Sequence, residues 1–228
     1  MFSGVAQEPD TGSPNPIFTR TTVPAVVAAD AVSANGYDSD VEQPNRGHPL
    51  GVAAARRLAR TGSVTVEPGL TDDELNRAEH RFGIEFADDH RAFLTTGLPV
   101  GQGWPDWRDG DADEITHRLR RPVEGVLFDV AENGFWYESW GPRPDDPDDA
   151  VALADRRLRT VPRLIPVYGH RYLPAGRGSF ANPVLSVVQT DIIIYGTDLN
   201  DYIGREFEPI ADLSGDWKAV DFWGRLVG

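Results

Sequence analysis

The sequence predicts an α+β fold, because it contains both strong helix-start signals and β-rich runs. Thr71 is followed by an acidic first turn with Glu74 three residues later, so that each residue can cap the backbone of the other. Asp146 precedes Pro147, the residue type favoured at the first position of a helix. The β-rich runs are 163–168, 183–188 and 191–195; the last two are almost continuously apolar, which indicates central strands covered on both faces.

The chain is predicted to consist of a flexible tail, residues 1–47, and a single domain, residues 48–228. Pro, Gly, Ser, Asn and Thr dominate the tail, and such a stretch buries too little apolar surface to offset its ordering entropy. The domain is predicted to begin with a short helix over 48–60, which Gly62 ends. A short strand or an extended entry is expected over 64–66.

A pair of helices is predicted next. The first buries Leu75 and Phe82 at helical spacing and ends at Gly83, and the second runs over 88–95. Later segments are expected to form a loop over 99–121, a strand over 123–130, a third helix from Asp146 to a point before Pro162, a terminal helix over 198–207, and a stretch that folds back through Trp217, Phe222 and Trp223.

The acidic charge of the chain is concentrated in its middle. The net charge is −14, and residues 61–155 contain 22 of the 36 acidic residues but only 8 of the 22 basic ones. Such a field repels nucleic-acid phosphates and attracts a basic protein. The sequence therefore predicts a basic protein partner and no nucleic acid; the alternative is that the charge serves solubility alone.

Cysteine is absent, which excludes disulfides, thiolate zinc ligands and a cysteine nucleophile. This composition fits a reducing compartment, and no secretory signal peptide is recognisable, so a cytoplasmic location is predicted. No segment approaches the ~20 apolar residues of a membrane span, and no membrane contact, metal or cofactor is expected.

Several segments, taken in order over residues 63–210, resemble one protein family. They are Gly69–Leu75, Ala78–Glu79, Phe82–Gly83, His90–Leu94, Gly97–Gly101, Gly103–Arg108, Asn133–Trp136, Leu164–Tyr172, Asn182–Val187, Asp191–Gly196 and Asp198–Leu199. This succession resembles the SUKH superfamily, in its bacterial branch; the superfamily includes fungal cell-wall-assembly regulators and bacterial immunity proteins. The resemblance implies helices packed on a mostly antiparallel sheet. It also implies a protein-binding role, often the neutralisation of a toxin, frequently a nuclease, and it brings no catalytic residues.

Aromatic and acidic side chains are dense between residues 104 and 140. Such a combination suits a protein-docking surface, because aromatic rings supply rigid contact area and carboxylates supply complementary charge. The alternative is that the rings pack in the core. The candidate partner-binding residues are Trp104, Asp106, Trp107, Asp109, Asp111, Asp113, Trp136 and Trp140.

A second candidate site surrounds His170, at the end of a predicted strand. With Tyr172, Asp191 and Asp198 it is expected to line a pocket, in which a His–Asp pair can orient an imidazole for base catalysis or hold a metal. The sequence lacks the metal motif of two histidines at i and i+4 and the Gly-x-Ser-x-Gly elbow, so a structural histidine is the alternative.

The function predicted from these features is that of a non-enzymatic, immunity-type protein, which neutralises a toxin domain, such as a basic nuclease, by occlusion. One alternative is a regulatory scaffold. The other is a small-ligand-binding protein or hydrolase that uses a pocket near His170.

Overall fold

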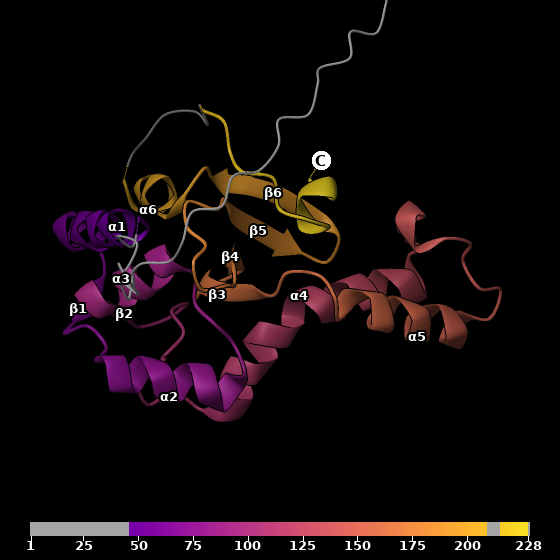
Figure 1. Ribbon diagram of the computed structural model, residues 1–228, viewed down its shortest axis with the longest axis horizontal. Helices are drawn as coiled ribbons and strands as arrows, with labels where there is room; N and C mark the ends of the chain where they lie inside the picture. Colours follow the sequence, from indigo (N-terminus) through magenta and orange to yellow (C-terminus); the bar gives the residue numbers. More distant parts are fainter. Residues whose placement is uncertain (1–45, 209–214, 228) are drawn as a thin grey trace, which may run out of the picture. The chain divides into compact units, whose positions relative to one another are not determined.

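The computed structural model describes residues 46–208 and 215–227, which belong to one compact unit, Glu42–Gly228. Most of the predicted tail, residues 1–45, lies outside the described residues. In the described residues there are six α-helices and two antiparallel sheets, which confirms the α+β fold class (Figure 1).

The larger sheet is an antiparallel meander whose strands follow one another in chain order. It consists of β3 (Leu164–Tyr168), β4 (Arg171–Pro174), β5 (Val184–Val188) and β6 (Asp191–Gly196). The smaller sheet pairs β1 (Thr65–Glu67) with β2 (Leu98–Val100).

Four of the six α-helices in the described residues begin at a capping side chain. Thr71 accepts a hydrogen bond from the Glu74 N–H at 3.2 Å, and Glu74 accepts one from the Thr71 N–H at 2.7 Å, so the predicted capping box is present. Asp111, Asp146 and Asp198 cap three further helices. The elements are α1 (His48–Thr61), α2 (Asp72–Phe82), α3 (Asp88–Thr96), α4 (Ala112–Glu132), η1 (Glu138–Trp140), α5 (Pro147–Leu158), α6 (Leu199–Phe207) and η2 (Trp223–Arg225).

The larger sheet has a hydrophobic core on each face, because successive strand side chains point to opposite sides. Ile165 and Leu173 face a core completed by α1, α2, α3 and α6. Leu164 and Leu185 face a second core completed by α4, α5 and Trp223. The sheet is therefore covered on both faces, as its apolar strands require.

The predicted loop over 99–121 and the predicted strand over 123–130 are wrong: much of this region is the single helix α4 (Ala112–Glu132). Ile115, Val126 and Val130 are buried at helical spacing, on one face of α4. Pro122 within this run favoured a break in the helix. Packing against α5 and the sheet outweighs that local preference, and α4 and α5 lie side by side (Figure 1).

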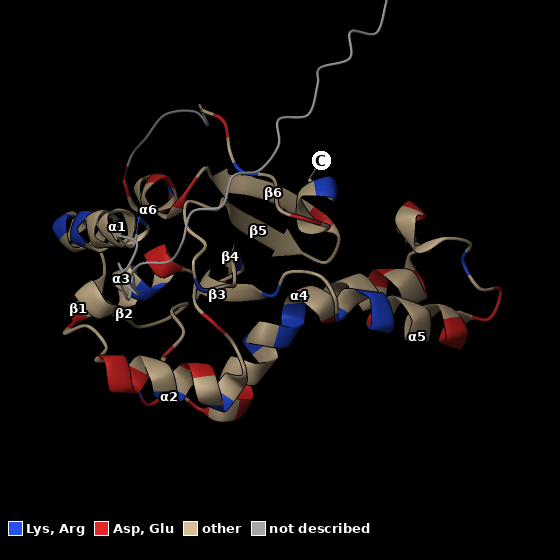
Figure 2. Ribbon diagram, in the orientation of Figure 1, with Lys and Arg blue, Asp and Glu red and all other residues tan. Residues whose placement is uncertain are grey.

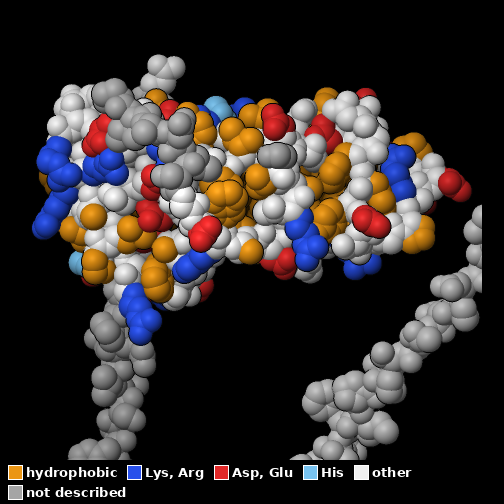
Figure 3. Space-filling view, turned by 90° about the horizontal axis from the view of Figure 1, so that it is seen from above, with side chains coloured by type: hydrophobic (Ala, Val, Ile, Leu, Met, Phe, Trp, Pro, Cys, Tyr) orange, Lys and Arg blue, Asp and Glu red, His pale blue; other side chains and the backbone are white. Residues whose placement is uncertain are grey.

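The structure also differs from the sequence predictions at two strands, β4 and β6. The sequence did not predict β4 as a separate strand, and β6 is an edge strand of its sheet, not a central one. In the described residues the outer edge of β6 has one isolated bridge, between Ile192 and Val227. Ile193 on β6 is 44% exposed, and Trp217 in the C-terminal segment is 47% exposed. Figure 3 shows hydrophobic side chains gathered near the middle of the face that contains β6.

The helix α1 crosses α3 with almost no space between their backbones. A Cβ atom added at Gly51 would lie 2.0 Å from the carbonyl oxygen of Asp89 and 2.7 Å from the Cβ of Ala92. Only glycine permits this approach. The contact places the buried side chains of Ala54 and Leu58 in the first core.

Candidate partner-binding surface

The predicted tryptophans do not form one surface. Trp104 and Trp107 are buried in the first core and Trp140 is buried in the second. Trp136 is half-buried, and its indole N–H donates to the Gly141 carbonyl oxygen at 2.7 Å. Each of these three tryptophans is at most 7% exposed, so the rings act mainly as core side chains.

The four aspartates predicted beside the tryptophans are exposed and lie together in the acidic loop, which is defined as residues 101–113 and includes the first two residues of α4. The Oδ1 atom of Asp106 accepts from the N–H groups of Arg108 and Asp109 at 3.1 and 3.0 Å. The Oδ1 atom of Asp111 accepts from the N–H groups at the start of α4. Asp109 and Asp113 make no side-chain contact of this kind, and none of the four carboxylates forms an ion pair with a described residue.

Arg108 fixes the acidic loop to the rest of the domain. Its Nε donates to Glu74 at 2.9 Å, its Nη1 to Glu67 at 3.1 Å, and its Nη2 to the carbonyl oxygen of Pro68 at 2.8 Å. The guanidinium thus joins the segment before α2, α2 itself and the loop, by charge-assisted hydrogen bonds. Its positive charge is used internally, so it does not neutralise the loop aspartates.

Trp107 anchors the acidic loop in the first core through ring contacts. Its ring meets Phe86 edge-on with centroids 5.0 Å apart, and meets Phe82 with centroids 6.1 Å apart. Between the loop and α2 lies a groove of about 630 Å³, to which Trp107, Phe82 and Ala78 contribute apolar surface. The loop therefore rests on a packed aromatic base beside a concave surface.

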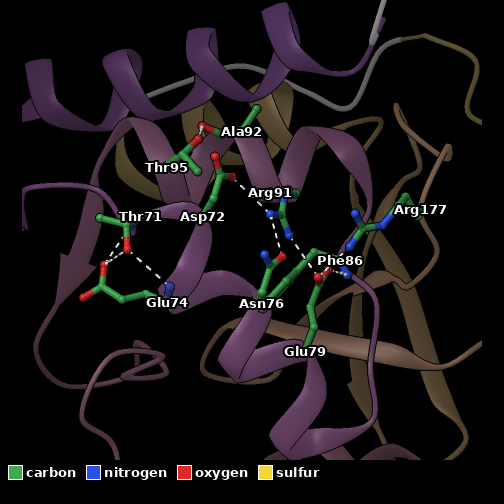
Figure 4. A network of polar contacts seen from close by, with 10 residues as sticks. All are labelled: Thr71, Asp72, Glu74, Asn76, Glu79, Phe86, Arg91, Ala92, Thr95 and Arg177. Atoms are coloured by element: carbon green, nitrogen blue, oxygen red, sulfur yellow. Dashed lines mark hydrogen bonds and ion pairs between the residues drawn. The ribbon is translucent and has the colours of Figure 1, made fainter. Parts of the chain in front are cut away.

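A buried carboxylate fixes α2 in turn. Glu79 accepts from Arg91 at 2.9 Å, from Arg177 at 2.6 Å and from the N–H of Phe86 at 2.9 Å (Figure 4). Arg91 continues the network to Asn76 and Asp72 on the same helix. Glu79 thus ties α2 to α3 and to the loop after β4, and the side of α2 that faces the acidic loop is held in place.

The charges of this region are unevenly paired. Hydrogen bonds from the Thr71 backbone and hydroxyl, and then from Arg108, lower the pKa of Glu74 to about 2, so this carboxylate stays ionised in its pair. Asp106 and Asp111 accept backbone N–H hydrogen bonds, but none of the four loop aspartates pairs with a described cation. Figure 2 shows acidic residues along α2 and around the start of α4, next to the loop.

The structure does not assemble the predicted pocket near His170. Tyr172 points to the second core and donates its hydroxyl to the Arg118 carbonyl oxygen at 3.3 Å. Asp191 begins β6 and Asp198 caps α6 after β6 ends, so the two lie roughly 20 Å apart along an extended strand. The side-chain contact of His170 is with Arg171, and the charges that act on it are those of Arg171, Arg121 and Glu206.

The ring of His170 instead contacts the guanidinium of Arg171. Partial burial, followed by the nearby charge of Arg171, lowers the pKa of His170. Arg171 is buried and held by Ser186 at 3.1 Å, by Glu206 at 3.2 Å and by the ring of Tyr195, whose centroid is 3.8 Å away. These contacts fill the space around Arg171 and connect the sheet with α6, which is a structural role.

Sequence reasoning found the aspartates but missed Arg108 and Glu79. Arg108 meets carboxylates 34 and 41 residues earlier in the chain, and Glu79 meets Arg177, which is 98 residues later. No local spacing indicates such pairs.

No family model, no curated protein and no solved structure matches this chain. Within residues 46–208 and 215–227, no helix has the length and apolar character needed to cross a membrane.

Proposed function

We propose that this protein is a non-enzymatic binding module whose acidic loop docks on a basic protein. The observation that carries the proposal is the role of Arg108: it fixes the loop through Glu67 and Glu74 and leaves Asp106, Asp109, Asp111 and Asp113 unpaired. A surface that is rigid before binding loses little conformational entropy when its partner docks.

The charge of the loop favours fast and selective encounter. Unpaired carboxylates on one surface attract a basic patch over a Debye length of about 10 Å, and this attraction weakens with salt. The adjoining groove of about 630 Å³ offers a concave surface, in which Ala78, Phe82 and Trp107 lie among polar and charged residues that include Arg77, Arg81 and Arg108.

The resemblance to the SUKH superfamily narrows the proposal to an immunity-type protein of the cytoplasm. In that role the loop would occlude the active surface of a toxin domain, and a nuclease is the expected partner class, because nucleases carry basic surfaces for their substrate. The resemblance motivates the choice of partner, and the loop geometry motivates the choice of surface.

Co-expression with the genes that flank its own tests the proposal. A flanking gene whose product arrests growth should be tolerated when this protein is present. The double variant Asp109→Lys/Asp113→Lys should abolish the protection and the complex, and added salt should weaken the wild-type complex.

The matched control is Glu132→Lys/Glu138→Lys, which makes the same change of net charge at exposed positions away from the loop. It should protect as the wild type does. Equal loss of protection in both double variants, with unchanged melting temperatures, would show that net charge matters and the loop does not.

A further inference from the structure

A cavity of about 430 Å³ lies between α4 and α5, apart from the acidic loop. It forms at the turn of α4 that contains Pro122, which itself contributes to the wall. Proline removes one backbone hydrogen bond and crowds the preceding turn, so a helix usually bends there. The cavity volume falls in the range of small-molecule sites, roughly 300–1,000 Å³.

The walls of the cavity are mainly apolar and come from four parts of the chain. The α4 residues contribute three branched side chains, α5 contributes one, β3 contributes one, and the C-terminal segment contributes an indole ring. These residues are Leu119, Val123, Leu127, Leu158, Leu164 and Trp223. The Trp223 N–H already donates to the Pro162 carbonyl oxygen at 2.7 Å, so the ring presents carbon surface to the cavity.

The rim of the cavity is cationic, in a chain of net charge −14. Arg120 and Arg159 are each paired one turn away on their own helix, with Glu124 at 3.1 Å and Asp155 at 2.5 Å. Arg163 also lines the rim, and within the described part of the chain it forms no ion pair. One nitrogen of its guanidinium donates to the Gly83 carbonyl oxygen, beside a second pocket that Arg163 also lines, and the others make no hydrogen bond to a described residue.

We infer that this cavity binds a small amphipathic carboxylate, such as a medium-chain fatty acid, with the chain among the apolar walls and the carboxylate on Arg163. The excess of one guanidinium over the two rim carboxylates provides the charge complementarity. Arginine is suited to the headgroup because its planar nitrogens match a carboxylate. The inference is independent of the acidic loop and of its proposed partner.

Titration of the full-length protein with dodecanoate, below the concentration at which it forms micelles, tests the inference. Calorimetry measures affinity, and methyl NMR locates the site. The methyl resonances of Leu119, Val123 and Leu164 should shift, while those of Leu75 and Leu98 in the other core should not.

Two substitutions separate the parts of the site. Val123→Phe fills the cavity and should weaken binding at least tenfold, whereas Val52→Phe, on α1 and away from the cavity, should not.

Arg163→Gln should weaken the binding of dodecanoate about tenfold, the loss expected for one charge-assisted hydrogen bond. Arg156→Gln, an exposed α5 arginine outside the cavity, is its matched control. Dodecanol should bind the wild type more weakly and should be insensitive to Arg163→Gln.

Several results would overturn the inference. They are the absence of shifts in the wild type, shifts confined to the other core, and unchanged affinity in a folded Val123→Phe variant. Dodecanol binding as tightly as dodecanoate, or equal affinity in the Arg163→Gln and Arg156→Gln variants, would refute the carboxylate assignment. None of these results would alter the test of the acidic loop.

Discussion

The hydroxyl of Tyr172 lies 3.3 Å from the carbonyl oxygen of Arg118, to which it donates a hydrogen bond. This carbonyl is the one whose normal helical donor would be the N–H of residue 122, and residue 122 is a proline. A side chain from β4 thus supplies the donor that α4 lacks. The contact explains how a proline is accommodated within a 21-residue helix.

Replacing this tyrosine should therefore destabilise the protein through α4. Tyr172→Phe is expected to lower the free energy of unfolding by about 1 kcal/mol, the usual net worth of one such hydrogen bond. In a Pro122→Ala background the backbone can supply the donor, so the same substitution should cost much less. Urea unfolding of the four proteins of this double-mutant cycle measures the coupling, and strict additivity would contradict the assignment.

The hydroxyl of Tyr202 gives the opposite expectation. It is buried and has no hydrogen-bond partner among the described residues, and burial raises the pKa of Tyr202. Tyr202→Phe removes a polar group that has lost its hydration without compensation, so stability should rise by about 1 kcal/mol. A melting temperature that falls in this variant would show that the hydroxyl has a partner in solution.

Two adjacent buried groups should make opposite contributions to the pH dependence of stability. Burial lowers the pKa of His90 from 6.5 to about 3, so the stability that His90 contributes is present above pH 6.5 and is lost as pH falls below it. Burial, aided by the charge of Asp198, raises the pKa of Asp89 from 3.8 to about 6. The ionised Asp89 carboxylate therefore lowers the free energy of unfolding above pH 6, and this destabilisation disappears as the pH falls toward 3.8.

Between pH 7 and pH 5 the free energy of unfolding should change by about 1–2 kcal/mol through each group, as a loss for His90 and a gain for Asp89. The free energy of unfolding of the Asp89→Asn variant should therefore fall more steeply between pH 7 and pH 5 than that of the wild type. His90→Leu should instead gain stability, relative to the wild type, over the same interval. Urea unfolding at the two pH values is the measurement, and parallel profiles for all three proteins would refute it.

Arg108 should control the order of the acidic loop. Arg108→Gln removes its pairing with Glu67 and Glu74, so amide exchange over residues 101–111 should quicken and stability should fall by about 1–2 kcal/mol. Arg120→Gln makes the same charge change at an exposed pair with Glu124, worth at most about 1 kcal/mol. Exchange that is equally slow in both variants would mean that Arg108 does not hold the loop.

The Glu79 network should be a larger source of stability than any exposed pair. Glu79→Gln leaves Arg91 without its buried partner, and breaking a buried pair costs about 3 kcal/mol or more. Arg177 is half exposed, so Arg177→Ala should cost about 1 kcal/mol or less. Thermal unfolding distinguishes the two, and equal losses would argue against the assigned role of Glu79.

Much of the fold was predictable because its signals are local. The capping box at Thr71 and Glu74 and the Asp146–Pro147 helix start depend on neighbours three residues apart or fewer. The region around Pro122 was mispredicted because the donor that compensates for it, Tyr172, is 50 residues away in the sequence. The edge position of β6 likewise depends on strand order, which its own apolar residues do not reveal.

The candidate site was predictable only in part, for the same reason. The aspartates of the acidic loop are consecutive enough to be noticed, but the burial of Trp104 and Trp107 depends on which helices close over them. The ring of Trp104 packs beside Phe93 and Phe207, and that of Trp107 packs beside Phe86, partners from three different helices or loops. The ambiguity between core and docking surface is resolved only by tertiary structure.

The crossing of α1 over α3 at Gly51 has a consequence for the evolutionary history of this chain. Any side chain at this position would force the two helices apart, since the obstructing atoms are the backbone of Asp89 and Phe93 and the Cβ of Ala92, none of which can rotate away. Position 51 should therefore stay fixed while exposed positions of the surface diverge. A relative too divergent to be detected by overall similarity should still carry glycine there, which gives remote-homology searches a position to weight.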